Sequence, residues 1–192
     1  DSISIGVRAG MTNQSSLSIS IGSNAGSVTQ GTQATAIGPD AGEYTQGRNA
    51  LAIGFKAGQS TQGVDSLAIG AGAGLTNQGT NSTAIGAGAG AATQGMSCIA
   101  IGPSAGKTSQ KTRSTAIGFQ AGTHGQGVGA LAIGANSGGA EQGTNSVAIG
   151  ASAGRTSQGI EAVAIGFESG QEKQGVRAVS LGYTAGAVNQ GE

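Results

Sequence analysis

Short stretches of the chain alternate small and bulky apolar residues, and they recur at a constant interval. The segments "SLAIG" (66–70), "STAIG" (82–86) and "AVAIG" (162–166) each place a bulky residue between two small ones and end in glycine. Strict alternation is typical of a β-strand with two different faces. One face would carry Leu, Val, Thr and Ile, and the other only Ala, Ser and Gly. We therefore expect one strand in each such segment.

The interval is 16 residues, and twelve repeats fill the 192 residues without insertion or remainder. Counting positions 1 to 16 within each repeat, the alternating segment occupies positions 2–6, and a second strand is expected around positions 11–13. Glycine at positions 6, 10 and 15 is expected to supply turn conformations that residues with a Cβ resist. A repeat of this kind is typical of one rung of a solenoid. The sequence predicts an all-β fold, a parallel β-solenoid (β-roll or β-helix) of twelve rungs that is able to form a trimer.

Besides the glycines at positions 6 and 10, positions 5 and 14 carry the same residue in at least eleven of the twelve repeats, and parallel stacking would place their side chains above one another at about 4.8 Å. Position 5 is expected to form an apolar ladder, the buried spine of the solenoid. Position 14 is expected to form a ladder whose amides hydrogen-bond from rung to rung, as stacked Asn and Gln do in cross-β assemblies. The position-5 residues are Ile5, Ile21, Ile37, Ile53, Ile69, Ile85, Ile101, Ile117, Ile133, Ile149, Ile165 and Leu181. The position-14 residues are Gln14, Gln30, Gln46, Gln62, Gln78, Gln94, Gln110, Gln126, Gln142, Gln158, Gln174 and Gln190.

Charge is balanced and confined to certain positions. Nine basic and nine acidic residues cancel, and none of them falls at positions 2–7, 9, 10 or 14. Because an unpaired charge is costly to bury, these positions are expected to lie inside or in an interface. The flat face at positions 2, 4 and 6 is expected to allow neighbouring chains to approach closely. Without a basic stripe or a long apolar run, neither nucleic acid nor membrane insertion is predicted.

Residues with catalytic or metal-binding chemistry are scarce. The only histidine, His124, is interpreted as a surface substitution, and the only cysteine, Cys98, as a small buried filler. The run "GAGAG" (70–74) lacks the G-x-G-x-x-G spacing of a dinucleotide fingerprint, and Gly72 in it is interpreted as an outward corner. No catalytic residue, metal site or cofactor is therefore predicted, and the chain is not expected to be an enzyme.

The segment "NSVAIGASAG" (145–154), with its relatives "STAIG" and "SLAIG", resembles the head repeats of trimeric autotransporter adhesins. That resemblance implies trimeric, left-handed parallel β-rolls displayed on a cell surface. The unit of those heads is shorter, and the second half of this repeat, "AGLTNQG" (73–79), differs from them. It is similar instead to 16-residue repeats in fibre and surface proteins of large algal viruses and some phages. Together the two resemblances imply an extracellular, cell-surface or virion-surface fibre.

We predict that residues 1–192 form a single repeat array, a piece of a longer fibre, with a structural and non-catalytic role as shaft or adhesin head. Its expected partner is itself, as a homotrimer or as end-to-end or lateral filaments, with a surface receptor or glycan as a further partner.

Two alternatives remain open. An ice-binding solenoid would use the Thr residues at positions 12 and 13, namely Thr29, Thr45, Thr61 and Thr93. A carbohydrate-binding or carbohydrate-cleaving solenoid would use exposed aromatics, namely Phe55, Phe119 and Phe167.

Overall fold

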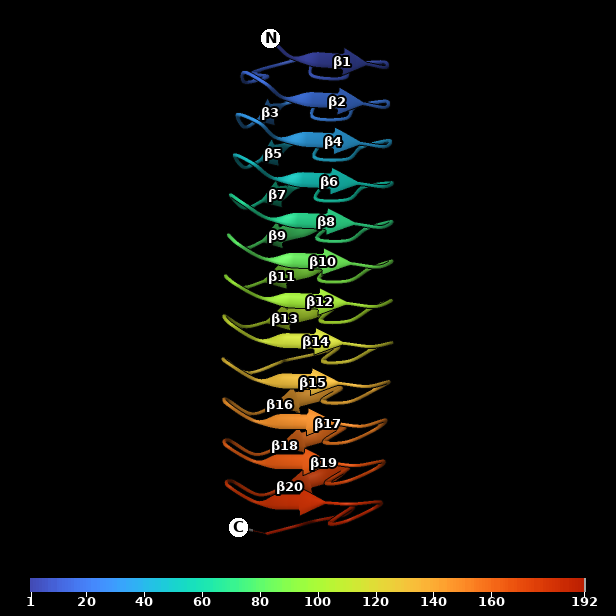
Figure 1. The fold of residues 1–192 in the computed structure, drawn as a ribbon, viewed down its shortest axis with the longest axis vertical. Coiled ribbons are helices and arrows are strands. Elements are labelled where there is room, and N and C mark those ends of the chain that lie inside the picture. Colours follow the sequence, from blue (N-terminus) through green and yellow to red (C-terminus); the bar gives the residue numbers. More distant parts are fainter. Residues whose placement is uncertain (192) are drawn as a thin grey trace. The chain divides into compact units, whose positions relative to one another are not determined.

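The computed structural model describes residues 1–191, in two compact parts, Asp1–Ser97 and Cys98–Glu192. Each part is a parallel β-solenoid, and no helix occurs anywhere in the described range. Each 16-residue repeat forms one rung, whose first strand occupies positions 3–5 and pairs with the first strands of its neighbours (Figure 1). The predicted fold class is confirmed for both parts.

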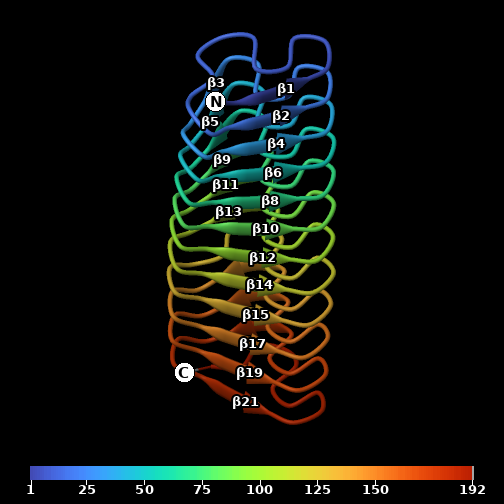
Figure 2. The same cartoon turned by 45° about the horizontal axis from the view of Figure 1, so that its top comes forward.

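In the N-terminal part, first strands and second strands form separate parallel sheets on opposite sides of the rung (Figure 2). The first strands are β1 (Ile3–Ile5), β2 (Ile19–Ile21), β4 (Thr35–Ile37), β6 (Leu51–Ile53), β8 (Leu67–Ile69) and β10 (Thr83–Ile85). The second strands are β3 (Thr29–Gln30), β5 (Thr45–Gln46), β7 (Thr61–Gln62), β9 (Thr76–Gln78) and β11 (Ala92–Gln94). The second strand thus ends at position 14, one residue later than expected.

The C-terminal part repeats this arrangement. Its first strands are β12 (Ile99–Ile101), β14 (Thr115–Ile117), β15 (Leu131–Ile133), β17 (Val147–Ile149), β19 (Val163–Ile165) and β21 (Val179–Leu181). Its second strands are β13 (Thr108–Gln110), β16 (Ala140–Gln142), β18 (Thr156–Gln158) and β20 (Glu172–Gln174). Between β13 and β16, the rung of repeat 8 contributes only isolated bridges through His124.

Like positions stack in register. Leu51 pairs with Leu67 and Ile53 with Ile69 in the N-terminal part. In the C-terminal part, Val147 pairs with Val163 in the same way. Because side chains alternate between faces, this register keeps the inner and outer rows of every rung aligned.

Main-chain hydrogen bonds between rungs continue through the corners. The N–H of Gly70 donates to the carbonyl of Ile53 at 2.8 Å, and the N–H of Gly72 to that of Phe55 at 2.9 Å. On the next side of the corner, the Gly74 N–H donates to Ala89 in the following rung at 2.9 Å. Corners bonded in this way leave few buried polar groups unpaired, so a chain poor in large side chains can still fold.

The interior is built from small residues and one glutamine per rung. Ala68 and Ala73 are fully buried, and Gln78 is 2% exposed. In β8 the middle residue is buried while its two neighbours are half-buried, so position 4 points in and positions 3 and 5 point out. The predicted buried spine at position 5 is therefore wrong, and Ile5 at the first rung is 60% exposed. The flat face lies inside the rung, so it is not available to a neighbouring chain.

The narrow interior explains this inversion. A Cβ built on Gly74 would lie 2.6 Å from the Oε1 atom of Gln78 and 3.3 Å from the Cβ of Ala68. These two atoms approach Gly74 from the two sides of the rung. No space remains between the two sheets for a Leu or an Ile, which must therefore point outward.

The glutamines join the two sides of the rung. The Nε2 atom of Gln78 donates to the carbonyl of Leu67 at 2.7 Å and to that of Ser82 at 3.3 Å. Bonds from amide to amide, as between Gln30 and Gln46 at 3.2 Å, occur near the chain ends. In the middle rungs the principal acceptor is the main chain of the first strand, which differs from the expected rung-to-rung ladder. Whether either ladder stabilises the fold stays a prediction.

Glycine serves different purposes at the three positions. Gly70 has a φ of 124°, and its Cβ would lie 2.8 Å from the main chain of Gly86. Gly79 has no left-handed φ, yet its Cβ would lie 2.5 Å from the main chain of the next rung. The sequence predicted a turn conformation at position 15. The structure shows instead a close approach between the main chains of successive rungs. The positive φ near it falls on position 1, as at Asn81 with 56°.

The second strand has two conformations. In β3 and β5, position 13 is extended, and the Thr29 N–H donates to the Tyr44 carbonyl at 2.8 Å. From Asn77 onward, position 13 is left-handed, as at Glu141 with φ 55°. There the Glu141 N–H donates to the preceding rung, to His124 at 3.1 Å. The extended positions hold threonine, whose β-branched side chain disfavours the left-handed region, although Thr93 adopts it.

Candidate functional site

The outward side chains of the first strands form a row that we call the aliphatic face. In the N-terminal part it consists of Ile3, Ile5, Ile19, Ile21, Thr35, Ile37, Leu51, Ile53, Leu67, Ile69, Thr83 and Ile85. In the C-terminal part it consists of Ile99, Ile101, Thr115, Ile117, Leu131, Ile133, Val147, Ile149, Val163, Ile165, Val179 and Leu181. Each part therefore presents a continuous band of aliphatic side chains interrupted only by threonine.

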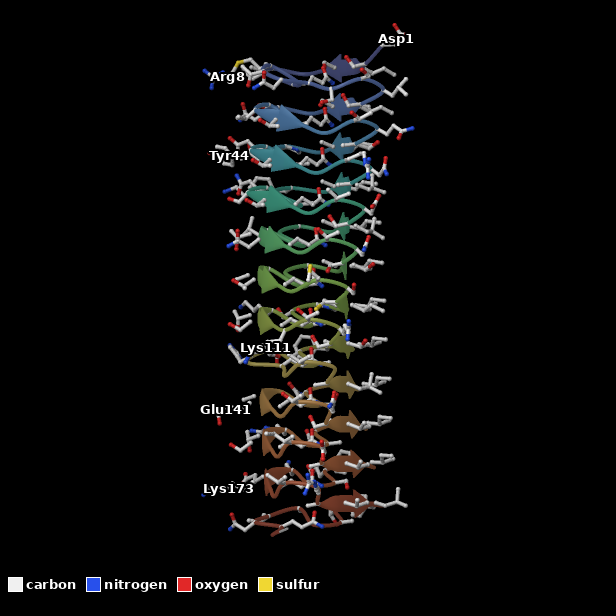
Figure 3. The ribbon with its side chains drawn as sticks, turned by 90° about the vertical axis from the view of Figure 1, so that its left-hand side faces the viewer. Asp1, Arg8, Tyr44, Lys111, Glu141 and Lys173 are labelled. Carbon is white, nitrogen blue, oxygen red and sulfur yellow. The ribbon has the colours of Figure 1, made fainter. Side chains whose placement is uncertain are left out.

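The aliphatic face is half-buried by its own neighbours and carries no charge. Ile99 is 38% exposed and Ile101 36%, although both lie within a sheet. In each part the first strands project these side chains to one side, whereas Tyr44, Glu141 and Lys173 point to the opposite side (Figure 3). Contiguous exposed apolar surface of this kind marks an interaction site in soluble proteins.

Aromatic side chains at position 7 extend this apolar surface around the corner. Phe55 and Phe119 are each 52% exposed. The rings of Phe167 and Tyr183 stack with centroids 5.5 Å apart, and the Lys56 ammonium lies 5.1 Å from the Phe55 centroid. Like residues thus contact each other between successive rungs on the outside as well as inside.

The charged residues lie away from the aliphatic face and are mostly solvated. The ion pair between Arg177 and Glu161 joins successive rungs at 3.0 Å, with side chains 78% and 48% exposed. Exposed pairs of this type contribute little stability. This ion pair therefore lies on the solvent-exposed surface of the rungs.

The remaining sequence-predicted residues lie apart from one another. Cys98 is fully buried, and its Sγ atom donates to the Lys111 carbonyl at 2.9 Å, as expected of a small filler. His124 is exposed, as predicted. A Cβ on Gly72 would meet nothing within 4 Å, which confirms that this glycine is an outward corner. Within residues 1–191, no three His, Cys, Asp or Glu side chains gather into a potential metal site.

The Thr row of the ice-binding alternative is short. Thr29, Thr45 and Thr61 are exposed and stack in register, but position 13 changes conformation at the next rung, Asn77. Beside this row, Tyr44 is 48% exposed and interrupts any flat array of hydroxyls. Among residues 1–191, this alternative therefore has one narrow row of stacked threonines on the second strands.

The distribution of charge and of side-chain size along the repeat indicates the aliphatic face, which alternation alone does not. Positions 3 and 5 belong to the charge-free set, which is compatible with an interior or with an interface. Positions 2, 4 and 9 hold only small residues, which implies a narrow interior. Such an interior has no room for Ile69 and its equivalents. A volume argument would have placed them outside.

Comparison with protein families supports the resemblance drawn from the repeats. The model of the YadA head domain repeat matches residues 109–137 and 142–154 in two copies, both within the C-terminal part. The predicted resemblance to trimeric autotransporter adhesin head repeats is thereby confirmed. The matched repeats are those of an adhesin-like structural repeat protein. No curated protein matches the chain with significant similarity.

The described residues also contain no helix of the length and apolarity that crossing a bilayer requires.

Proposed function

We propose that the chain is a fibre-forming structural protein, without catalysis, whose copies associate through the aliphatic face. The observation that supports this most directly is the uncharged band of Ile, Leu, Val and Thr that runs along every first strand of each part. A surface of this kind is stabilised by removal from water, at about 25 cal/mol for each Å² of apolar area. The gain recurs at each rung, so association strengthens with the number of rungs.

A homotrimer is the assembly that the YadA head match favours, with three parallel chains turning their aliphatic faces to a common axis. We place this assembly on the outside of a cell or a virion, as shaft or head of an adhesin-like fibre. Both compact parts carry the same repeat, and we propose that they belong to one array. The same logic allows further copies to add laterally or end to end.

Self-association can be tested with two matched variants of the full chain. We expect Ile53→Asp/Ile69→Asp to break association, because an aspartate in the apolar interface is buried without a partner. The control, Thr45→Asp/Thr61→Asp, places the same charges on the second-strand side and should assemble like the unmodified chain. Analytical ultracentrifugation gives the mass, and circular dichroism confirms that each variant retains its β structure.

A monomeric unmodified chain would contradict the proposal outright. It would also be contradicted if the Ile53/Ile69 variant assembled normally, since the contact would then lie elsewhere. Loss of assembly in the control alone would assign the contact to the second-strand side.

A further inference from the structure

A notch lined by both polar and apolar atoms lies on the second-strand side of the C-terminal part, away from the aliphatic face. It has a volume of about 220 Å³. It spans the rungs of repeats 8, 9 and 10 and is open to solvent. Its lining consists of Gln120, Thr123, His124, Asn136, Gly139, Ala140, Arg155 and Thr156.

The notch exists because repeat 9 has the smallest pair of side chains at positions 11 and 12. Gly139 and Ala140 stand there, whereas the rung above has Thr123 and His124 and the rung below Arg155 and Thr156. The three rungs are held in register, since the His124 N–H donates to Gly139 at 3.0 Å and the Ala140 N–H to Arg155 at 2.9 Å. Flanking rungs lie roughly 10 Å apart at the spacing of parallel strands, which leaves room for one pyranose ring.

The polar groups of the notch include several that are not engaged elsewhere. Within residues 1–191 the side chains of Gln120, Asn136, His124 and Arg155 make no hydrogen bond or ion pair with the protein. No carboxylate lines the notch, and the adjacent carboxylate of Glu141 accepts a hydrogen bond from Ser157 at 3.2 Å. One arginine, one histidine and two carboxamide residues therefore line a single small space, with side chains that are exposed to solvent or half-buried.

We infer that this notch binds a sugar that carries a carboxylate. The planar guanidinium of Arg155 can form two parallel hydrogen bonds with a carboxylate. The carboxamides of Gln120 and Asn136 each offer donors and an acceptor, as a pair of sugar hydroxyls requires. One cation among neutral polar groups suits a ligand with one charge and several hydroxyls. The inference deepens the adhesin-like role but is independent of self-association, because none of these residues belongs to the aliphatic face.

Ligand-observed saturation-transfer NMR on the full chain tests this directly, with D-glucuronate as the probe. We expect glucuronate to bind, and D-glucose to bind at least about tenfold more weakly because it lacks the charge-assisted bonds. Arg155→Gln should weaken glucuronate binding by a similar factor, and Gly139→Gln should abolish it by filling the notch. Glutamine already occupies position 11 at Gln59 and Gln171, so both variants use a side chain that this position accommodates.

The matched control is Arg113→Gln, which removes the same charge from position 1 of repeat 8, where Gln33 stands in repeat 3. It should bind glucuronate like the unmodified chain. The inference is overturned if glucuronate does not bind, if glucose binds equally well, or if Arg113→Gln weakens binding as much as Arg155→Gln. Tighter binding of D-glucose 6-sulfate than of glucuronate would show that the notch selects a sulfate, which would overturn the assignment of a carboxylate-bearing sugar.

Sedimentation separates this test from that of the proposed function. Arg155→Gln should assemble like the unmodified chain, because the change lies outside the aliphatic face. Normal assembly without glucuronate binding would refute the notch alone, and binding without assembly would refute self-association alone.

Discussion

The first strands carry small side chains on their inward face and bulky side chains on their outward face. In β8, Ala68 points inward and is fully buried, whereas Leu67 and Ile69 on either side of it point outward and are half-buried. In an ordinary sheet the bulky face packs on the core. Here the distance between the two sides of the rung admits only small side chains beside the glutamine, so the bulky side chains point outward. Alternation identifies two faces, but the available volume decides which of them is inside.

The inward face is also where hydrogen bonding is most demanding. Gln78 is buried with its amide nitrogen satisfied by main-chain carbonyls, while its Oε1 atom has no hydrogen-bond partner among the described residues. On the outward face, no polar group of Leu67 or Ile69 has to be accommodated beyond the main chain. Substitutions on the two faces should therefore differ in size and kind.

The largest effect is expected from enlarging an inward side chain. Ala68→Leu should destabilise the fold by about 3 kcal/mol or more, because it overpacks a space already filled by Gln78 and Gly74. The outward control, Leu67→Ala, should change the melting temperature of the dissociated chain only slightly. Thermal unfolding followed by circular dichroism measures both. Equal losses in the two variants would mean that the faces do not differ.

The second effect concerns two glycines of the same corner. Gly70→Ala should cost about 3 kcal/mol, because its Cβ would collide with the main chain of Gly86 and its φ is 124°. Gly72→Ala should cost about 1 kcal/mol, because it meets no atom within 4 Å and only the left-handed φ of 64° opposes it. Urea unfolding at equilibrium compares them. A Gly72 variant as unstable as the Gly70 variant would contradict the assigned outward corner.

The third effect is the loss of the glutamine strut. Gln78→Ala should cost about 2 kcal/mol, since it removes hydrogen bonds to Leu67 and Ser82 and leaves a cavity. Thr76→Ala removes one partly exposed hydroxyl, which donates to Ala91 at 3.1 Å, and should cost less. The same urea titration decides between them, and similar midpoints would refute the strut.

The smallest expected effect is a gain in stability. Where position 4 is serine, as at Ser20, its hydroxyl donates to the glutamine Oε1 atom, here that of Gln30, at 2.7 Å. Ala68→Ser should give the unpartnered Oε1 atom of Gln78 the same donor and stabilise the fold by about 1 kcal/mol. Leu67→Ser is the outward control and should give no gain. A lower melting temperature for Ala68→Ser would show that the oxygen needs no donor.

Much of the fold could be predicted from the repeat. Alternation located the first strands. Because Ile69 and its equivalents recur every 16 residues at the same position, the pairing of like residues between neighbouring strands could also be predicted. The orientation of the strands could not be read from alternation, because that pattern is unchanged when the two faces are exchanged. Similarly, the invariance of Gln78 indicated a role inside the repeat, but its main-chain acceptors depend on the width of the rung. The notch over Gly139 required knowing which side chains neighbour it in the rungs above and below.

The uniform stacking of rungs within each part has a consequence for how such a gene can change. Gain or loss of whole 16-residue repeats preserves the contacts of the first strands and of the corners, since each rung offers its neighbours the same main-chain donors and acceptors there and the same glycines at positions 6 and 10. Deletion of a single residue within β8 would instead exchange the rows and direct Ile69 into the space that holds only Ala68. Length polymorphism in steps of one repeat should thus be tolerated among natural variants, while shifts within a repeat should be eliminated.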